Sequence, residues 1–407
     1  GTASSIVYGL DEVMAKREDL ENITVLSAFT VRPLKMMEKE CNRVMSYFMG
    51  PQERKALLAG RGDYTSFSLD ELATWVYKVA RPDVVCLEVS PPDENGYMSY
   101  GATGVVFHEL LKDAGKTVIL QVNKYAPYVY GEHNLIHCTE ADAIAELDVP
   151  LGELPLPSED DASDEQRQMC RFLMDEIHDG DTIQLGTGSL ATALGYMLKE
   201  KNDLGLHTEI MGDSIMELIR NGNINNSKKT FMPGKSVVGF CYGSRAVYDF
   251  IDRNEPMYFM PLTIINHPNC IAKNDNMISI NNALMVDLTG QVMSEAMPAF
   301  NQHSGIGGQV DYVRGAQMSK GGKSFIALES TFFSKKTGKG GSHIVCTMPP
   351  GSAITASRAD VQYIVTEYGC VNLKELTMKE RVRAMISISH PDYRDQLTEE
   401  AKQYHLL

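Results

Sequence analysis

The chain has 407 residues, of which 43% are hydrophobic and 22% charged, and a formal net charge of −15. These proportions are ordinary for a water-soluble globular protein, and the length predicts two or three domains. The negative charge argues against a nucleic-acid partner, which needs a face rich in lysine and arginine. No stretch approaches the ~18 uninterrupted apolar residues of a membrane helix, so no membrane partner is expected.

The eight cysteines are scattered without a C-x-x-C pair, and the ten histidines are dispersed as well. This pattern argues against a zinc knuckle and a disulfide scaffold, and a reducing cytoplasm is the expected location. The chain contains no H-E-x-x-H and no G-x-S-x-G motif. We therefore expect neither a metal centre nor a serine nucleophile.

Two parts of the chain repeat the same order of features. GTASS at the N-terminus and GTGSL at residues 186–190 are each followed by a helix-like segment and a short strand, NITVLSAF or GLHTEIM. Residues 48–67 then parallel 241–260, and 84–99 parallel 281–294 with related G-x-M-S and G-x-x-M-S endings. Three matches in one order predict an internal duplication.

A proline-rich, acidic segment at residues 148–166, DVPLGELPLPSEDDASDEQ, separates the two parts. Such composition is typical of a linker, and it predicts domains at residues 1–155 and 156–407. Short β-branched runs such as VVCLEV and TVILQV alternate with helix-like segments. The pattern predicts α/β domains with mainly parallel sheets, and the duplication makes them two similar open domains.

Two glycine-rich segments in the second part have the composition of ligand-binding loops. In IQLGTGSLATAL (183–194) an apolar strand runs into glycines and then a helix, where free backbone N–H groups can hold an anion or an oxyanion. No G-K-[ST] follows, and the spacing lacks the third glycine of a dinucleotide fingerprint. The second segment is HSGIGGQVDYVRGA (303–316). A plain turn is the alternative for both.

Glu209 lies where a strand is expected to give way to a helix. The helix is expected to begin at a cap formed by Asp213 or Ser214 and to stop at Gly222. Carboxyl ends of strands are where open α/β sheets place their chemistry, although a single loop glutamate is usually only solvated. The corresponding strand in the first part, NITVLSAF, carries no carboxylate. A carboxylate in only one of two copies indicates a functional role.

Several long segments resemble one known family. They are GTGSLATAL, LHTEIMGD, NNALMVDLTGQVMSE, SGIGGQVDYVRGAQMSKGGKS, VTEYGCVNLKELTMKERVRAMISISHPDYRDQL, VSPPDENGYMSYG and LQVNKYAPYVYGEHNLIH. They are similar to the acetyl-CoA hydrolase/transferase family, in particular to 4-hydroxybutyrate and butyryl-CoA:acetate CoA-transferases. The resemblance runs from about residue 20 to the end. It implies two similar α/β domains with the active site between them, and a homodimer.

The resemblance also assigns site residues. The family's catalytic glutamate falls on Glu209. Its CoA-contacting residues fall on Gly186, Thr187, Gly188, Ser189, Leu190, Asn282, Gly307 and Gly308, and the oxyanion donors are the backbone N–H groups of Thr187 and Gly308. The implied substrates are an acyl-CoA and a short-chain carboxylate, with no cofactor beyond coenzyme A and no metal.

The implied reaction is CoA transfer through a covalent glutamyl-CoA thioester. Acyl-CoA hydrolysis by the same glutamate is the alternative, because water access is not readable from a sequence. A non-catalytic CoA- or nucleotide-sensing protein is a second alternative, and the retained glutamate with both glycine loops argues against it. A nicotinamide oxidoreductase is disfavoured by the missing fingerprint.

Overall fold

The structure is a computed structural model, and it describes residues 7–30, 32–104, 108–153, 161–186, 188–299, 301–334 and 338–407. Its largest sheet has eight strands in the order β12-β11-β10-β9-β13-β18-β22-β23. The bounds are β9 (Thr182–Leu185), β10 (Gly205–Met211), β11 (Ser236–Cys241), β12 (Met257–Phe259), β13 (Met277–Asn282), β18 (Lys323–Ala327), β22 (Tyr363–Thr366) and β23 (Gly369–Asn372). All neighbouring strands are parallel except the antiparallel pair β22–β23. The strands are apolar and largely buried, as a parallel sheet covered on both faces requires.

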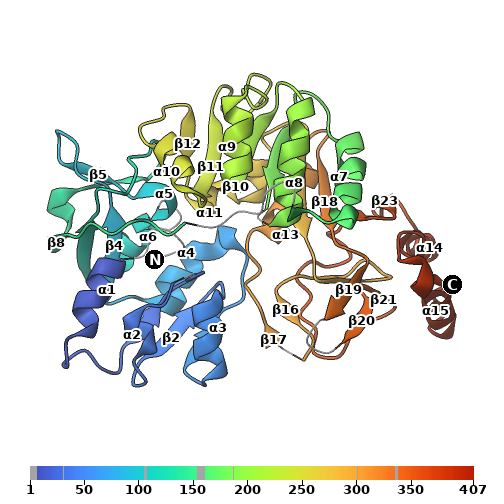
Figure 1. Cartoon of the computed structure of the whole chain (residues 1–407), viewed down its shortest axis with the longest axis horizontal. Helices are drawn as coiled ribbons and strands as arrows, with labels where there is room; N and C mark the ends of the chain where they lie inside the picture. Colours follow the sequence, from blue (N-terminus) through green and yellow to red (C-terminus); the bar gives the residue numbers. More distant parts are fainter. Residues whose placement is uncertain are drawn as a thin grey trace.

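Helices cover this sheet in two groups. The first group lies along one face in chain order and consists of α7 (Asp164–Glu176), α8 (Ser189–Met197), α9 (Asp213–Arg220) and α10 (Arg245–Ile251). Figure 1 shows α7, α8 and α9 in green shades beside one another. The second group packs together and against strands β10, β11, β13 and β18: α11 (Leu262–Ile265), α12 (Pro268–Ile271) and α13 (Gln309–Met318). Two helices of this second group, α11 and α13, contribute residues to the candidate site.

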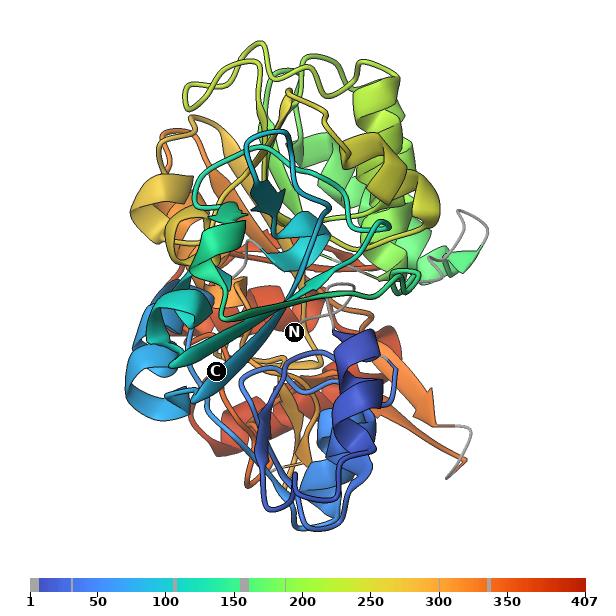
Figure 2. The same ribbon diagram turned by 90° about the vertical axis from the view of Figure 1, so that its left-hand side faces the viewer.

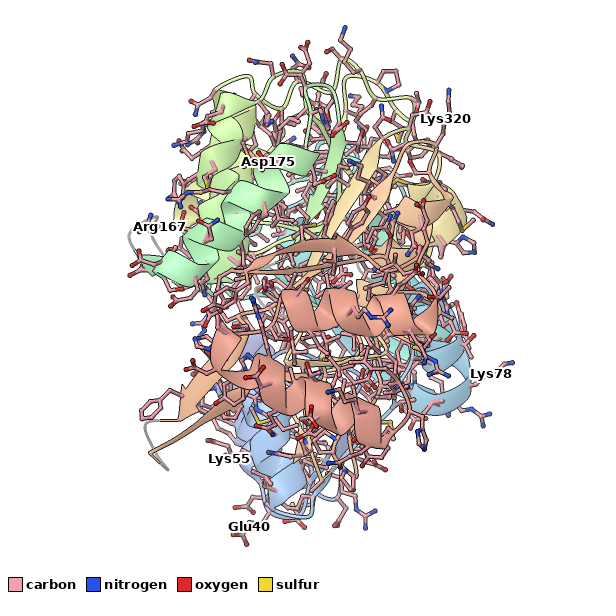
Figure 3. The ribbon with its side chains drawn as sticks, turned by 90° about the vertical axis from the view of Figure 1, so that its right-hand side faces the viewer. Glu40, Lys55, Lys78, Arg167, Asp175 and Lys320 are labelled. Atoms are coloured by element: carbon pink, nitrogen blue, oxygen red, sulfur yellow. The ribbon has the colours of Figure 1, made fainter. Side chains whose placement is uncertain are left out.

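The C-terminal part adds short strands and a pair of helices. The strands are β14 (Met285–Asp287), β15 (Val292–Met293), β16 (Ala296–Met297), β17 (Asn301–Gln302), β19 (Thr331–Ser334), β20 (Lys339–Ser342) and β21 (Ile344–Val345). The helices α14 (Met378–Ser387) and α15 (Pro391–Gln403) lie side by side, in salmon in Figure 3. A core of their own, which includes Val382, Met385 and Leu397, holds these elements together.

The N-terminal part contains smaller sheets, drawn in blue to teal in Figure 2. Parallel strands make up the orders β1-β2-β3 and β4-β6-β8, and β5 pairs antiparallel with β7. The strands are β1 (Thr24–Leu26), β2 (Arg43–Ser46), β3 (Gly62–Tyr64), β4 (Val84–Val89), β5 (Tyr97–Ser99), β6 (Thr117–Val122), β7 (Leu135–His137) and β8 (Ala143–Glu146). The helical elements are α1 (Tyr8–Ala15), α2 (Lys35–Glu38), α3 (Pro51–Leu58), η1 (Leu69–Glu71), α4 (Leu72–Thr74), the π-helical η2 (Trp75–Ala80), α5 (Gly101–Gly104) and α6 (His108–Ala114).

The α/β class with mainly parallel sheets is confirmed. The orders β1-β2-β3 and β4-β6-β8 have counterparts in β10-β11-β12 and β13-β18-β22, where β9 joins the two sets. This similarity of order supports an internal duplication, which stays a prediction. The domain boundary between residues 155 and 156 also stays a prediction, and residues 154–160 lie outside the described part of the chain.

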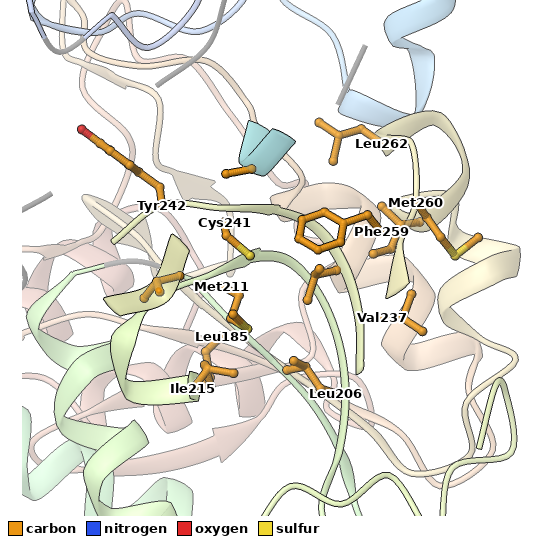
Figure 4. Packing of buried hydrophobic residues seen from close by; sticks show 14 of the residues in the cluster. Leu185, Leu206, Met211, Ile215, Val237, Cys241, Tyr242, Phe259, Met260 and Leu262 are labelled. Carbon is orange, nitrogen blue, oxygen red and sulfur yellow. The ribbon is translucent and has the colours of Figure 1, made fainter. Parts of the chain in front are cut away.

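The main core holds β10, the strand that carries Glu209, in place between β9 and β11. Leu185, Leu206, Met211, Ile215 and Val237 are at most 4% exposed and pack together, as Figure 4 shows. Burying a side chain of this size contributes about 1.5–3 kcal/mol. The strand end next to the site is therefore rigidly supported.

The helix after β10 begins earlier than the sequence predicts. Gly212 is the N-cap of α9, so the expected cap at Asp213 or Ser214 is wrong. The Asp213 carboxylate accepts hydrogen bonds from the Ser244 backbone N–H (2.9 Å) and from the Ser244 hydroxyl, and is thus engaged with another loop. The expected stop is confirmed, because α9 ends at Arg220 and Gly222 has a φ of 82°.

Candidate active site

A cavity of about 290 Å³ lies between the N-terminal and C-terminal parts of the chain. The N-terminal part contributes an apolar wall, formed by Ala28, Phe29, Tyr47, Phe48 and Leu69. The C-terminal part contributes polar and glycine residues as well, namely Gln184, Gly186, Glu209, Ile210, Phe240, Leu262, Asn281, Asn282, Ser294, residues 304–309 and Tyr312. Ligand sites of this kind combine apolar walls with a few placed polar groups.

Glu209 lies inside β10, two residues before the strand ends, and not in the connection that the sequence predicts. Its side chain is partly exposed and lines the cavity. His207, two residues earlier, is buried, and its Nε2 lies 2.9 Å from the Ile265 carbonyl oxygen. Burial, with the Lys229 charge, lowers the pKa of His207 to about 3, so its imidazole is neutral. This contact joins β10 to the last residue of α11, and it fits an orienting role for His207.

Asn266, directly after α11, donates from Nδ2 to Glu209 Oε2 at 2.7 Å. Burial raises the pKa of Glu209 to about 7, while this amide and the Gly308 backbone N–H oppose the rise by stabilising the carboxylate. Two donors thus converge on one carboxylate at the wall of a cavity. A carboxyl group whose pKa lies near neutrality is typical of a functional site.

Gly308 must be a glycine because of this close approach. A Cβ atom at this position would lie 1.9 Å from Glu209 Oε2 and 2.3 Å from Asn266 Nδ2. Gly308 is also the N-cap of α13, and the first N–H groups of a helix have no partner within the helix. At Gly305, in the same loop, a Cβ atom would lie 2.2 Å from the Tyr47 carbonyl oxygen. The glycine loop therefore packs directly against the N-terminal part.

Asp311 places a second carboxyl group behind Asn266. It lies in the first turn of α13, is 2% exposed, and its Oδ2 is 3.4 Å from Asn266 Nδ2. Burial, followed by the negative charges of Asp70 and Glu209, raises its pKa well above the ordinary value. Asp70 belongs to η1, in the N-terminal part.

The structure brings most of the sequence-predicted residues to one place. Glu209, Gly186, Asn282, Gly307 and Gly308 line the cavity. Gly188 has a φ of 112° and lines a small adjoining pocket of about 20 Å³ that shares Gly186. Among the described lining residues of both hollows, Ser189 and Leu190 do not occur. Ser189 begins α8, and the Leu190 side chain is buried in the main core. Thr187 lies outside the described residues.

Sequence reasoning missed Asn266, Asp311 and the aromatic wall. Asn266 follows the apolar run Leu262–Ile265 and carries no motif, so only the fold brings it to Glu209. Asp311 gave a weak signal in the sequence, because it stands between the apolar residues Val310 and Tyr312. A carboxylate in such a position needs a partner or a proton.

Within the described ranges, no group of three or more His, Cys, Asp or Glu side chains is arranged to hold a metal ion. None of the described helices combines the length and the apolar character that a membrane crossing needs.

Comparison with known proteins assigns the family. Residues 1–150 match the profile of the acetyl-CoA hydrolase/transferase N-terminal domain, and residues 243–401 match that of the C-terminal domain. The chain belongs to the acetyl-CoA hydrolase/transferase family. This result confirms the resemblance seen in the sequence; the matched ranges include cavity residues 28–69 and 262–312, and Glu209 lies between them.

Individual members of the acetyl-CoA hydrolase/transferase family are similar over most of the chain. The 4-hydroxybutyrate coenzyme A transferase of Clostridium kluyveri is 42% identical over 88% of this chain and 81% of its own length. The butyryl-CoA:acetate CoA-transferase of Anaerostipes caccae is 35% identical over 97% of this chain and 90% of its own. The crystal structure of RipA from Yersinia pestis aligns with a TM-score of 0.91 and 34% identity, covering 100% of this chain and 93% of that one.

Proposed function

We propose that the protein is a CoA-transferase that moves coenzyme A between a short-chain acyl-CoA, such as butyryl-CoA or 4-hydroxybutyryl-CoA, and a carboxylate such as acetate. The observation that carries this proposal is Glu209 in the cavity wall, held by Asn266 and Gly308. The names of the two similar transferases support the substrate class.

In the first half-reaction, the Glu209 carboxylate attacks the thioester carbonyl, and CoA thiolate leaves. The product is a mixed anhydride between the acyl group and Glu209. The thiolate then attacks the glutamyl carbonyl, which releases the first carboxylate and leaves a glutamyl-CoA thioester. In the second half-reaction a new carboxylate attacks the glutamyl thioester, which expels CoA thiolate and forms a second mixed anhydride. The thiolate then attacks the acyl carbonyl of this anhydride, which gives the new acyl-CoA and restores the Glu209 carboxylate.

The residues around Glu209 suit the tetrahedral intermediates on its own carbonyl. Asn266 Nδ2 and the Gly308 N–H already point at the glutamyl oxygen, so negative charge that develops there meets two donors. One such donor contributes about 3–4 kcal/mol to the transition state. The Thr187 N–H is a further proposed donor, for the oxyanion of the acyl group. Thioester energy is conserved throughout, so neither a metal nor a cofactor beyond CoA is needed.

The walls of the cavity suit a small apolar acyl chain. Phe29, Phe48 and Leu69 line it together with Phe240 and Leu262. A volume of about 290 Å³ is at the lower end of the range of ligand pockets, which suits a short acyl chain and the thiol end of CoA. The described lining residues include no Lys, Arg or His, so a second carboxylate on the substrate would find no cation to pair with in the cavity. Dicarboxylates are therefore expected to be poor acceptors.

The testing experiment is incubation with butyryl-CoA, with and without acetate, while acetyl-CoA and free CoA are followed separately. The expected result is acetyl-CoA formation that depends on acetate, parallel double-reciprocal lines, and little free CoA. Free CoA released equally without acetate would replace this proposal by the acyl-CoA hydrolase, the alternative that uses the same glutamate. Succinate in place of acetate is expected to react more slowly. Light scattering of the same sample tests the homodimer that the family resemblance implies.

A further inference from the structure

Among the described residues, the side-chain amide of Asn266 makes hydrogen bonds through its nitrogen only. Its Nδ2 group carries two hydrogens, and the two acceptors within reach are Glu209 Oε2 at 2.7 Å and Asp311 Oδ2 at 3.4 Å. Its Oδ1 atom is buried and makes no hydrogen bond to any residue that the structure describes. The direction of the amide therefore depends on the two carboxyl groups alone.

One of these two acceptors changes during the reaction proposed above, on which this inference rests. While Glu209 is a carboxylate, its charge attracts the amide N–H strongly. Once Glu209 becomes an anhydride or a thioester, its oxygen is a neutral carbonyl and a weaker acceptor. The hydrogen bond is then needed most, because the next step builds negative charge on that oxygen. Asp311 takes no part in the chemistry and is the same acceptor before and after acylation.

Asp311 is fixed in place by both parts of the chain. It is 2% exposed in the first turn of α13, three residues after Gly308, and the Asp70 backbone N–H of η1 donates to it. The charged and titratable groups around it are Asp70 on η1, Glu209 on β10, and Tyr312 and Arg314 on its own helix. Arg314 is itself paired with Asp360 at 3.1 Å.

We propose that Asp311 is a positioning residue, which accepts the second N–H of Asn266 and keeps the amide nitrogen directed at Glu209 while Glu209 is acylated. Asp311 touches no substrate in this arrangement; it acts through Asn266. The burial and the neighbouring negative charges that raise its pKa keep it protonated at neutral pH, where it still has an oxygen that can accept. A neutral Asp311 also places no second negative charge beside the carboxylate of Glu209.

The experiment compares Asp311→Ala, Asp311→Asn and a matched control, Asp395→Asn, which changes an exposed aspartate on α15. Each protein is mixed with butyryl-CoA alone, and the glutamyl-CoA adduct is followed by rapid quenching and mass spectrometry of the intact protein. Acetate is then added to the adduct, and the rate of its discharge is measured between pH 6 and pH 9.

Asp311→Ala is expected to form the adduct but to discharge it about tenfold more slowly, the effect of one lost hydrogen bond. Asp311→Asn keeps an amide oxygen as acceptor, so its discharge rate is expected to stay near the wild-type value. Because asparagine does not titrate, the discharge rate of Asp311→Asn is expected to stay constant at high pH. The discharge rate of the wild type is expected to fall there, as Asp311 ionises. Adduct formation passes through the same intermediate on the glutamyl carbonyl and is expected to slow as well, whereas a purely structural role would leave the pH profile unchanged.

The outcomes separate this inference from the proposed function. If the wild type and Asp395→Asn form no adduct, the CoA-transferase mechanism itself fails. If they form it, and Asp311→Ala discharges it at the wild-type rate, the positioning role is wrong. Circular dichroism of each variant shows whether it is folded. If Asp311→Ala is unfolded, the pH profile of Asp311→Asn decides, because a profile identical to the wild type would contradict the role.

Discussion

Each part of the chain carries a glutamate on a strand, and the contrast between the two is instructive. Glu88, on β4, is 2% exposed and accepts hydrogen bonds from Gln121 (3.0 Å) and Asn123 (2.9 Å). Burial raises its pKa to about 8, against about 7 for Glu209. A raised pKa is thus common to both and does not identify the nucleophile. Only Glu209 lines the cavity.

The surroundings of the two carboxylates differ in a second respect. The donors to Glu88 are side chains of β6 and of the residue that follows it, in the same small sheet. The donors to Glu209 come from two separate loops, at Asn266 and Gly308, and one of them is a backbone N–H. A carboxylate that faces a ligand cavity and meets donors from separate loops has the geometry of a reacting group; a carboxylate enclosed by its own sheet does not.

The largest expected effect comes from exchanging each glutamate for glutamine. Glu209→Gln removes the nucleophile and is expected to lower CoA transfer by more than about 10⁴-fold, as losing a covalent nucleophile does in other enzymes. Glu88→Gln is expected to leave transfer unchanged, because Glu88 does not line the cavity. The assay is acetyl-CoA formation from butyryl-CoA and acetate. Wild-type activity in Glu209→Gln would contradict the assignment.

The next largest effect concerns the donors. Asn266→Ala removes one of the two donors at Glu209 and is expected to reduce kcat by about 10²–10³-fold, with a smaller change in KM. Asn269→Ala, which changes an exposed asparagine on the next helix, is the control and should behave like the wild type. Equal kcat values for the two variants would show that Asn266 does not act on the developing charge.

A pH profile sharpens the comparison further. The carboxylate form of Glu209 is the nucleophile, and its pKa is raised to about 7. The kcat/KM for acyl-CoA is therefore expected to rise about tenfold per pH unit below pH 7 and to level off above it. In Asn266→Ala the midpoint should move to higher pH, because the lost hydrogen bond stabilised the charged form. A midpoint near the ordinary value of 4.5 in the wild type would contradict the burial of Glu209.

The last prediction concerns stability. In the folded protein Glu88 holds its proton up to about pH 8, whereas the unfolded chain releases it near the ordinary value of 4.5. The free energy of unfolding therefore falls as pH rises through this window, by at most about 1.4 kcal/mol per unit of pKa difference. Glu88→Gln abolishes this loss. Urea unfolding should show a gain for the variant that is absent at pH 4 and grows towards pH 8; a gain independent of pH would contradict it.

The sequence by itself determined the α/β class, the family and the position of the catalytic candidate. These features are encoded locally: β-branched runs form strands, glycines mark the loops before α8 and α13, and Glu209 falls in the strand-like segment that precedes a helix. The exact limits were less certain, since α9 begins at Asp213 with Gly212 as its cap. Asp213 binds Ser244 instead of capping, and that contact joins residues 31 positions apart.

Only the tertiary structure decided what surrounds Glu209. Asn266 lies 57 positions away in the chain and Tyr47 comes from the N-terminal part, so no local pattern joins them to β10. The fold also places the Leu190 side chain in the core, although Gly188, two residues earlier, lines the small pocket. Burial and hydrogen bonding are properties of the folded chain, because they depend on which segments meet. They turn a glutamate that any strand can carry into one with a pKa near neutrality, beside a cavity that an acyl group fits.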